Sequence, residues 1–344
     1  MAYSLVIGGA GFIGVNLADS LLKEGKDVAV LDNFSRNGTE QNLAWLKGRH
    51  GNVKVIRADI REHGRKLEDA VKNADEIYHM AAQVAVTTSV ENPREDFGIN
   101  ALGTLNVLEA MREAGSEAPL VFASTNKVYG KMERAEVEEK GKRYEYKALP
   151  NGVSEEMPVD FYSPYGCSKG CADQYVRDYA RIYGLNTVVM RQSCIYGERQ
   201  FGIEDQGWVA WFAIAAVLGK KLTIYGNGKQ ARDVLHVSDL INSFTLAVKK
   251  IKKTSGKIYN IGGGPKNTLS LLEYLEMLGE MLGKKIEYGF GDWRPGDQPL
   301  YVSDIRKAKN ELGWEPKIRA KEGAGSLVEW VKRNSGEIES VVFP

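Results

Sequence analysis

Gly8-Gly9-Ala10-Gly11-Phe12-Ile13-Gly14 decides the fold, because it follows the apolar run Tyr3–Ile7 directly and opens a helical pattern. An apolar run that ends in glycines before a helix predicts a strand–turn–helix unit. The spacing Gly8-x-x-Gly11-x-x-Gly14 is a variant of the commoner G-x-G-x-x-G. Such a turn lets backbone N–H groups approach a pyrophosphate at a helix N-terminus. Since glycine turns also follow strands for purely structural reasons, a second signal is needed.

That second signal is Asp32, at the end of the next strand candidate. A carboxylate there can accept both ribose hydroxyls of an adenosine, so the chain is predicted to bind a dinucleotide. Asp32 would repel a 2′-phosphate, whereas Arg36 could pair with one. The balance favours NAD over NADP. Phe12, Ile13, Asn33 and Ser35 are the neighbouring cofactor candidates.

Composition restricts the class of protein. The 344 residues are 43% hydrophobic and 26% charged, with a net charge of +1. These values predict an ordinary globular chain and argue against a dedicated binder of nucleic acid or anionic membrane. The longest apolar run, Trp208–Leu218, is shorter than the roughly 20 residues that cross a bilayer. Tyr3–Ile7 leaves no room for a secretory signal, and three cysteines with four scattered histidines predict neither disulfides nor a metal site. We expect a cytoplasmic α/β enzyme.

Strand and helix candidates alternate through the first half of the chain, which predicts right-handed crossovers and a parallel sheet. The fold expected is α/β: a Rossmann-type doubly wound parallel sheet with a smaller α/β substrate-binding domain. The boundaries expected are 1–192 and 193–344, with about 236–261 returning to the first domain. The strand candidates are Tyr3–Ile7, Val28–Leu31, Val53–Arg57, Glu76–Met80, Leu120–Ser124, Thr187–Arg191, Leu222–Tyr225, Ile258–Ile261 and Ile286–Gly289. The helix candidates are Ile13–Glu24, Asn100–Glu113, Tyr165–Tyr183, Trp208–Leu218 and Leu269–Leu282.

The segment Lys131–Pro150 is dominated by charge and has no apolar period. We interpret it as a solvated surface excursion, with an active-site lid as the alternative.

The catalytic candidates are Thr125, Tyr165 and Lys169. Tyr165-Gly166-Cys167-Ser168-Lys169 places a phenol and an ammonium on one helical face. The charge of Lys169, added to that of an oxidised nicotinamide, predicts a lowered pKa for Tyr165, which then serves as general base or acid. Ser124 and Thr125 end a strand candidate, at the sheet edge where ligands bind, and Thr125 could hold the substrate oxygen against the phenol.

These motifs resemble the extended short-chain dehydrogenase/reductases, and within them the nucleotide-sugar epimerase/dehydratase family. The resemblance also covers Arg191-x-x-x-x-Tyr196-Gly197 and nearly the whole chain. It implies that Asp59 and Ile60 flank the adenine, that Ala81, Ala82 and Gln83 line the cofactor channel, that Asn100 supports the site, and that Ser193 touches the nicotinamide. It also implies a homodimer or homotetramer.

Dehydratases of this family need carboxylates beside the catalytic threonine, where this chain has Asn126 and Lys127. Epimerisation needs only that the keto sugar takes the hydride back on its other face. The stretches Ser124–Gly130, Tyr162–Gly166 and Arg199–Trp208 resemble the CDP-paratose/CDP-tyvelose 2-epimerases, which implies a CDP-hexose substrate. Whether CDP-glucose suffices stays open. The alternatives are a 4-epimerase, which usually carries Asn where this chain has Cys194, a plain NADP-dependent reductase, and a non-catalytic NAD(P) sensor.

The substrate candidates follow from the same resemblance. Arg232 and Arg294 match the diphosphate-binding arginines, with ion pairs to Asp233 or Asp297 as the alternative. Tyr225 could stack on the base or belong to the core. Gln206 and Trp208 are further candidates, together with Thr125 and Cys194.

Overall fold

The structure is a computed structural model that describes residues 2–133, 135–294 and 297–343. The chain forms two compact units. Unit 1 comprises Met1–Val128, Ser163–Arg191 and Ile241–Tyr259, and unit 2 comprises Tyr129–Tyr162, Gln192–Leu240 and Asn260–Pro344. The segment Tyr129–Tyr162, which we assigned to the first domain from the sequence, is thus part of unit 2.

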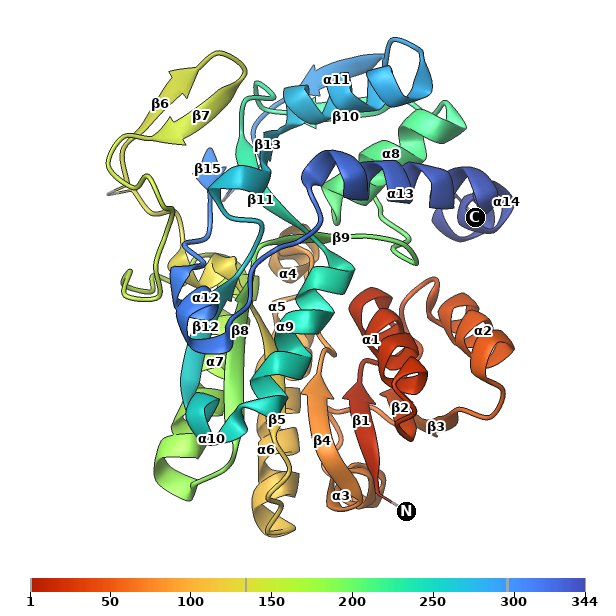
Figure 1. The fold of residues 1–344 in the computed structure, drawn as a ribbon, viewed down its shortest axis with the longest axis vertical. Coiled ribbons are helices and arrows are strands. Elements are labelled where there is room, and N and C mark those ends of the chain that lie inside the picture. Colours follow the sequence, from red (N-terminus) through yellow and green to blue (C-terminus); the bar gives the residue numbers. More distant parts are fainter. Residues whose placement is uncertain (1, 134, 295–296, 344) are drawn as a thin grey trace. The chain divides into compact units, whose positions relative to one another are not determined.

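A seven-stranded sheet with the order β12-β8-β5-β4-β1-β2-β3 organises unit 1 (Figure 1). The pairs β1·β2, β1·β4, β2·β3 and β4·β5 are parallel. The strand order changes direction at β1, which pairs with both β2 and β4, and this is the topological switch point where such sheets bind ligands. The expected α/β Rossmann-type sheet is therefore confirmed. Its strands are β1 (Tyr3–Ile7), β2 (Val28–Asp32), β3 (Lys54–Arg57), β4 (Ala74–His79), β5 (Leu120–Thr125), β8 (Thr187–Gln192) and β12 (Lys257–Ile261).

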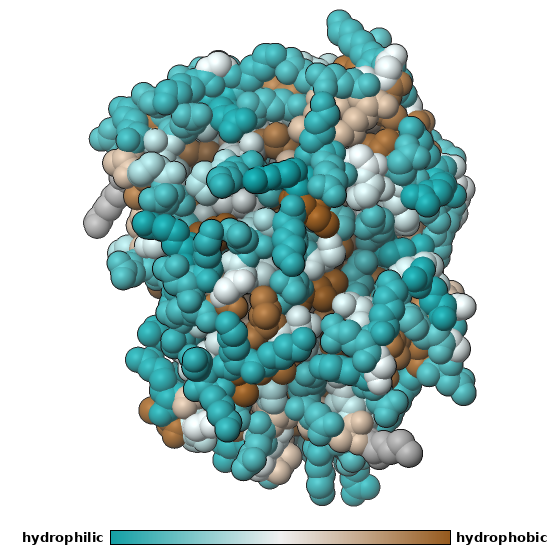
Figure 2. All heavy atoms as spheres, viewed as in Figure 1, coloured by the Kyte–Doolittle hydropathy of each residue, from teal (hydrophilic) through white to brown (hydrophobic). Residues whose placement is uncertain are grey.

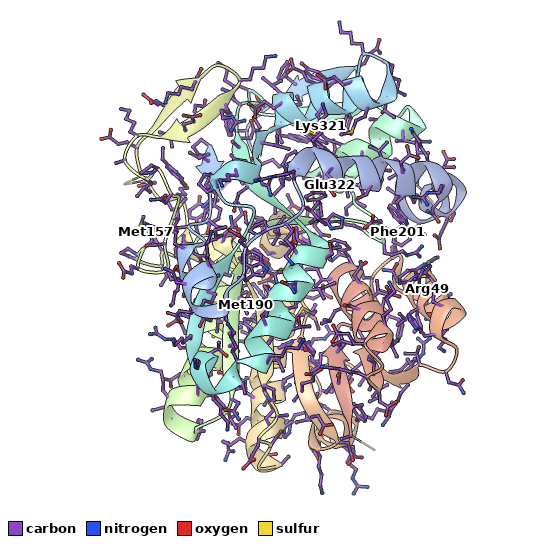
Figure 3. All side chains as sticks on the ribbon, in the orientation of Figure 1. Arg49, Met157, Met190, Phe201, Lys321 and Glu322 are labelled. Atoms are coloured by element: carbon purple, nitrogen blue, oxygen red, sulfur yellow. The ribbon has the colours of Figure 1, made fainter. Side chains whose placement is uncertain are left out.

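The central strands are continuous apolar runs because both faces of a parallel sheet are covered. All five residues of β1 and of β2 are buried. The helices that alternate with the strands include α1 (Phe12–Lys23), α2 (Thr39–His50), α3 (Arg65–Lys72), α4 (Val86–Glu91), α5 (Pro93–Phe97), α6 (Gly103–Glu113), α7 (Ser163–Tyr183) and α9 (Val237–Lys249). Arg49 extends from α2 (Figure 3) and pairs with Asp19 of α1 at 3.1 Å.

One helix differs from its prediction. We expected a regular helix over Asn100–Glu113, but a π-helical turn, η1 (Gly98–Leu102), precedes α6. It contains Asn100, which is 1% exposed. A π-helical turn holds one more residue than an α-turn, and it is found frequently at functional sites.

A buried ion pair fixes α7 against the sheet. Arg191 of β8 donates from Nε and Nη2 to the two carboxylate oxygens of Asp173, each at 2.9 Å. Ser124 of β5 donates to the same carboxylate at 2.6 Å. Asp173 is fully buried and Arg191 is 2% exposed. Two strands and the helix that begins with Ser163 are therefore held at one point.

Unit 2 has a core of its own, built around α8 (Trp208–Leu218) and α13 (Ala320–Arg333). The predicted helix Leu269–Leu282 begins later than expected, because Thr268–Ser270 forms strand β13, and Ser270 caps α11 (Leu271–Leu282). The predicted strand Ile286–Gly289 is shifted to β14 (Tyr288–Gly291). The other strands and α-helices of unit 2 include β9 (Cys194–Tyr196), β10 (Leu222–Tyr225), β11 (Ala231–His236), β15 (Leu300–Tyr301), α12 (Arg306–Leu312) and α14 (Ser335–Val342). The short helix α10 (Ile251–Thr254) lies in unit 1, and two 3-10 turns are η2 (Asn126–Tyr129) and η3 (Pro265–Asn267).

The charged segment Lys131–Pro150 is more ordered than we expected. It contains an antiparallel hairpin of β6 (Val137–Lys140) and β7 (Arg143–Tyr146). Tyr146 packs against Ala231 and Leu300 and donates its hydroxyl to the Leu300 carbonyl at 3.1 Å. Strand β7 of the hairpin alternates partly buried aromatic residues with charged ones, so it shows no run of apolar residues. The hairpin therefore packs on unit 2 and is not a solvated loop.

The face of the molecule in Figure 2 is mostly hydrophilic, with small separate hydrophobic areas. Among the described residues, none of the helices combines the length and apolar character that a membrane span requires.

Asp173→Asn should lower the free energy of unfolding by about 3 kcal/mol, because the Arg191 guanidinium then stays buried without a counter-charge. Urea denaturation measures this. Arg112→Gln removes an exposed ion pair with Glu109 and serves as the control, with an unfolding free energy close to that of the parent. Equal effects of both substitutions would contradict the importance of the buried pair.

Candidate active site

Close backbone contacts around the glycine-rich turn form a cradle after β1. Gly8 has φ +75°, and a Cβ on it would lie 2.5 Å from the Ala81 nitrogen. A Cβ on Gly14 would lie 2.2 Å from the Gly8 carbonyl oxygen, and one on Gly11 would lie 3.3 Å from it. Phe12 and Ile13 then begin α1. The sequence requires glycine at Gly8 and Gly14 because no larger residue fits.

Asp32 is buried at the end of β2 and faces this turn. Its carboxylate accepts hydrogen bonds from the Ala10 nitrogen at 3.0 Å and the Phe34 nitrogen at 2.9 Å. Burial raises the pKa of Asp32, although these backbone donors oppose the shift. The carboxylate therefore lies beside the glycines, as the sequence predicted, and retains lone pairs for a further donor.

The other adenosine candidates lie around Asp32. Ser35 bonds its neighbour Asn33 at 2.8 Å, and Asn33 in turn donates to Asp59 at 2.9 Å. The hydrogen bond from Arg61 lowers the pKa of Asp59 to about 2, so this carboxylate is charged. Arg36 is exposed. Ile60 is buried next to Asp59, and its carbonyl accepts from Asn106 at 2.8 Å.

Asn100 joins the segment after β4 to helix α7. Its side-chain oxygen accepts from the Gln83 nitrogen at 3.0 Å, and its Nδ2 donates to the Gln83 carbonyl and to the Ser168 hydroxyl, each at 3.1 Å. Ala81 contacts Gly8, and Ala82 is partly buried between Ala81 and Gln83. The residues expected to line the cofactor channel are therefore adjacent to the cradle or anchored through Asn100.

Thr125, Tyr165 and Lys169 come together in unit 1. Thr125 is the last residue of β5, and its hydroxyl is hydrogen-bonded to the Tyr165 phenol. Tyr165 lies in the first turns of α7, where its backbone nitrogen donates to the buried Ser89 hydroxyl at 3.1 Å. Lys169 lies one helical turn further, and its Nζ donates to the Ala123 carbonyl at 2.7 Å. The spacing of the motif places phenol and ammonium on the same face, as predicted.

The expected lowering of the Tyr165 pKa is not produced by the protein's own side chains. Burial raises the pKa of Tyr165 to about 12, and the hydrogen bond with Thr125 offsets only part of this. Burial also lowers the pKa of Lys169 to about 7, so its positive charge is only partly present near neutral pH. The spacing of the motif indicates the charge of Lys169 but not the cost of removing both groups from water.

Two predicted cofactor residues use their hydroxyls to bind buried carboxylates. Ser124 donates to Asp173 at 2.6 Å, and Ser193 in unit 2 donates to the Asp233 carbonyl at 2.9 Å and bonds the Asp233 carboxylate. Both serines therefore have a structural partner, whatever else they contact.

In unit 2 the substrate candidates form pairs with one another. Trp208 Nε1 donates to the Cys194 sulfur at 3.4 Å. Trp208 also packs edge-to-face on Tyr274, with ring centroids 5.5 Å apart. Gln206 lies in the adjacent turn, where its backbone bonds Ile203.

The two arginines are each paired with a carboxylate. Arg232 is 8% exposed and bonds Asp297 at 2.7 Å, which is one of the ion pairs left open as an alternative. Arg294 pairs with Asp205 at 2.9 Å, not with Asp297. Its guanidinium lies 4.0 Å from the ring centre of Tyr225. Tyr225 is the residue predicted to stack on a base, and Arg294 thus covers one face of its ring.

The sequence reasoning missed three buried residues that shape these sites, Asp96, Ser168 and Asp173, and it named Asp233 only as a possible partner of Arg232. Asp173 follows Lys169 by four residues on the same helical face, which was the available signal for it. Asp96 follows the charged residues Arg94 and Glu95, so nothing in its surroundings distinguishes it. Nothing in the spacing distinguishes Ser168 from an ordinary helical serine. Among the described residues, no group of three His, Cys, Asp or Glu side chains could hold a metal ion.

The parallel sheet, the glycine cradle and the Thr125–Tyr165–Lys169 set together define an extended short-chain dehydrogenase/reductase. The chain belongs to the family described as GDP-mannose 4,6 dehydratase, whose model matches residues 5–327. It is 46% identical over 332 residues to a CDP-paratose 2-epimerase of Salmonella typhi, covering 95% of this chain and 98% of that relative.

Solved structures give the same fold. A UDP-glucose 4-epimerase of Thermus thermophilus in complex with NAD has a TM-score of 0.80 at 34% identity and covers 96% of this chain and 98% of its own. A UDP-glucose 4-epimerase of Thermotoga maritima with UDP-glucose has a TM-score of 0.82 at 30% identity and covers 96% and 99%. The family resemblance read from the motifs is therefore confirmed.

Proposed function

We propose that the protein is an NAD-dependent nucleotide-sugar epimerase that inverts C2 of a CDP-hexose. The observation that carries the proposal is the 46% identity, over nearly the full length of both chains, to a CDP-paratose 2-epimerase. The Thr125–Tyr165–Lys169 set supports an oxidation and reduction of a sugar hydroxyl. Asn126 and Lys127 beside Thr125 supply no carboxylate for removing water, which argues against the dehydration named in the family description.

The residues of unit 1 fit NAD. Side chains larger than glycine would fill the cradle at Gly8 and Gly14, and Asp32 offers a carboxylate to ribose hydroxyls. Asp32 would also repel a 2′-phosphate, which favours NAD over NADP. When bound, NAD would supply the redox chemistry, as the acceptor and donor of hydride for the sugar carbon.

The chain's own residues move the proton and hold the substrate. Tyr165 takes the proton of the C2 hydroxyl as C2 is oxidised to a ketone, and it gives the proton back after the keto sugar has turned its other face. Thr125 holds the substrate oxygen against the phenol. Lys169, together with the positive charge that an oxidised nicotinamide would supply, would offset the burial that raises the pKa of Tyr165 to about 12.

Arginine side chains anchor the diphosphate while the hexose turns. Arg232 and Arg294 are charged donors suited to phosphate oxygens, and a diphosphate would compete with Asp297 and Asp205 for them. Binding energy taken from this remote group allows the sugar to rotate without leaving.

A 4-epimerase is the second candidate, because a 33% identical relative from Methanocaldococcus jannaschii is named as a putative UDP-glucose 4-epimerase. The position where 4-epimerases carry an asparagine is Cys194 here, and its thiol already accepts from Trp208. A thiol cannot repeat the hydrogen bonds of an amide, which disfavours this reading.

Purified protein incubated with CDP-glucose or CDP-paratose, with no cofactor added, tests the reaction. We expect mannose from the first or tyvelose from the second after mild acid release, identified by chromatography. Tyr165→Phe should lower the rate by about 100-fold or more while the protein still binds NAD. Galactose from CDP-glucose would make the enzyme a 4-epimerase, and near-normal turnover by Tyr165→Phe would refute the mechanism.

Gly14→Ala should abolish retention of NAD, because the added methyl group would overlap the Gly8 carbonyl and displace the turn. The NAD released from heat-denatured protein measures this. Gly48→Ala, where a Cβ meets nothing within 4 Å, is the matched control and should release as much NAD as the parent. Full retention by Gly14→Ala would refute the cradle as the NAD site.

A homo-oligomer formed through unit 1 is part of the proposal. Apolar side chains are exposed on α5, η1 and α7, elements that contact one another: Phe97, Leu102, Tyr175, Ile182 and Tyr183. An exposed apolar cluster of this kind marks an interface. Ile182 is 66% exposed, so Ile182→Glu should give a monomer by light scattering, whereas Ile203→Glu in unit 2 should not. A monomeric parent protein would refute this part.

A further inference from the structure

Asp96 is a buried carboxylate to which the proposed reaction gives no role. We infer that Asp96 is a positioning residue whose carboxylate is a counter-charge that favours the ammonium form of Lys169. The inference rests on the proposed function, because the charge of Lys169 matters to catalysis only if Tyr165 exchanges a proton with the substrate.

The hydrogen bonds of Asp96 leave one side of its carboxylate uncompensated. The residue lies in α5 and is 1% exposed. Oδ1 accepts from Asn100 Nδ2 at 3.1 Å, and the Ser168 hydroxyl also bonds this side chain. Oδ2 has no hydrogen-bond partner among the described residues. A carboxylate buried in this way needs a nearby cation if it is to stay charged.

Lys169 is the corresponding buried cation. It is 2% exposed, its Nζ donates to the Ala123 carbonyl at 2.7 Å, and it lies 4.2 Å above the ring centre of Phe122. Both contacts favour a charged nitrogen. Ser168, which bonds Asp96, is the residue that precedes Lys169 in α7, so one helix brings both groups together.

The ionisable groups that face Lys169 come from three elements. Asp173 and Tyr165 belong to α7, His79 belongs to β4, and Asp96 belongs to α5. Asp173 is already neutralised by Arg191 of β8 through two hydrogen bonds. Burial lowers the pKa of His79 to about 3, so it is neutral. Among the described residues facing Lys169, Asp96 is therefore the carboxylate whose charge no arginine balances.

Removing the charge of Asp96 should shift the pKa values of Lys169 and Tyr165 in a known direction. Asp173 and Asp96 both raise the pKa of Lys169, against the burial that lowers it, and Asp96 also raises the pKa of Tyr165. In Asp96→Asn, Lys169 would lose its proton at lower pH, which moves the alkaline limb of the pH–rate profile to lower pH. Tyr165 would also lose its proton at lower pH, which moves the acidic limb in the same direction. If Asp96 had a purely structural role, its substitution would lower the maximal rate and leave both limbs of the pH–rate profile unchanged.

The rate of epimerisation of the CDP-sugar is measured against pH for the parent, Asp96→Asn and two controls. We expect both limbs of Asp96→Asn to move down by about one pH unit. Asp96→Glu keeps the charge and should keep the limbs of the parent. Glu95→Gln removes a neighbouring exposed carboxylate and should change nothing. Limbs of Asp96→Asn that coincide with those of the parent would overturn the inference.

A second measurement is independent of turnover and of the proposed function. NMR of protein labelled with 13C-lysine follows the titration of Lys169, whose signal is assigned by its loss in Lys169→Arg. We expect a midpoint in Asp96→Asn about one pH unit below that of the parent. Equal midpoints, or a parent Lys169 that is fully neutral at pH 7, would overturn the inference even if Asp96→Asn is unstable or no CDP-sugar is turned over. Absence of any epimerase activity in the parent would refute the proposed function alone.

Discussion

The buried pair between Asp173 and Arg191 is the interaction on which the rest of unit 1 depends. It joins α7 to β8, and the bond from Ser124 extends the connection to β5. Thr125 follows Ser124 directly, and Lys169 lies one helical turn before Asp173. Two charges buried together cost desolvation energy that their attraction offsets only in good geometry, so the pair tolerates little movement. That requirement fixes the position of helix α7 relative to the end of β5.

Close packing of the backbone is the constraint at the other end of the site. The backbone of Gly8 lies in close contact with Gly14 and Ala81. These contacts leave β1, α1 and the segment after β4 little room to move relative to one another. Asp32 adds a further contact to this region by accepting a hydrogen bond from the Ala10 nitrogen. Rigid backbone donors and a fixed carboxylate need no reorganisation when a charged ligand arrives, and this pre-organisation is what a tightly held cofactor requires.

Patterns that are local in sequence predicted the fold, and they placed the candidate catalytic residues on the elements where the structure has them. Glycines after a strand, a carboxylate after the next strand, and a phenol and an ammonium four residues apart each determine a geometry with few alternatives. The contacts that the sequence did not predict join residues far apart in the chain. Arg294 lies on the ring of Tyr225, and Cys194 pairs with Trp208, because of loop conformations that no periodicity encodes.

The protonation of the site was the least predictable feature for a related reason. The pKa values of Tyr165 and Lys169 depend on how completely each group is removed from water. Burial of that kind is a property of the assembled unit, whereas the spacing in the motif reports only that the two side chains share a face. The hairpin of β6 and β7 was missed because its partly buried aromatic residues alternate with charged residues over only a few positions.

The π-helical turn over Gly98–Leu102 also limits which changes of chain length this helix can accept. An α-helix advances by about 100° per residue, and a π-helical turn accommodates one residue more than an α-turn does. Deleting a single residue there would leave an ordinary α-turn, so the segments on either side would keep their relative orientation and only the side chains within the turn would change direction. Asn100 lies inside the turn, so its side chain would no longer face Gln83 and Ser168 as it does now, although every side chain that bonds it would still be present in the chain. This short segment therefore encodes orientation through the number of its residues as much as through their identity.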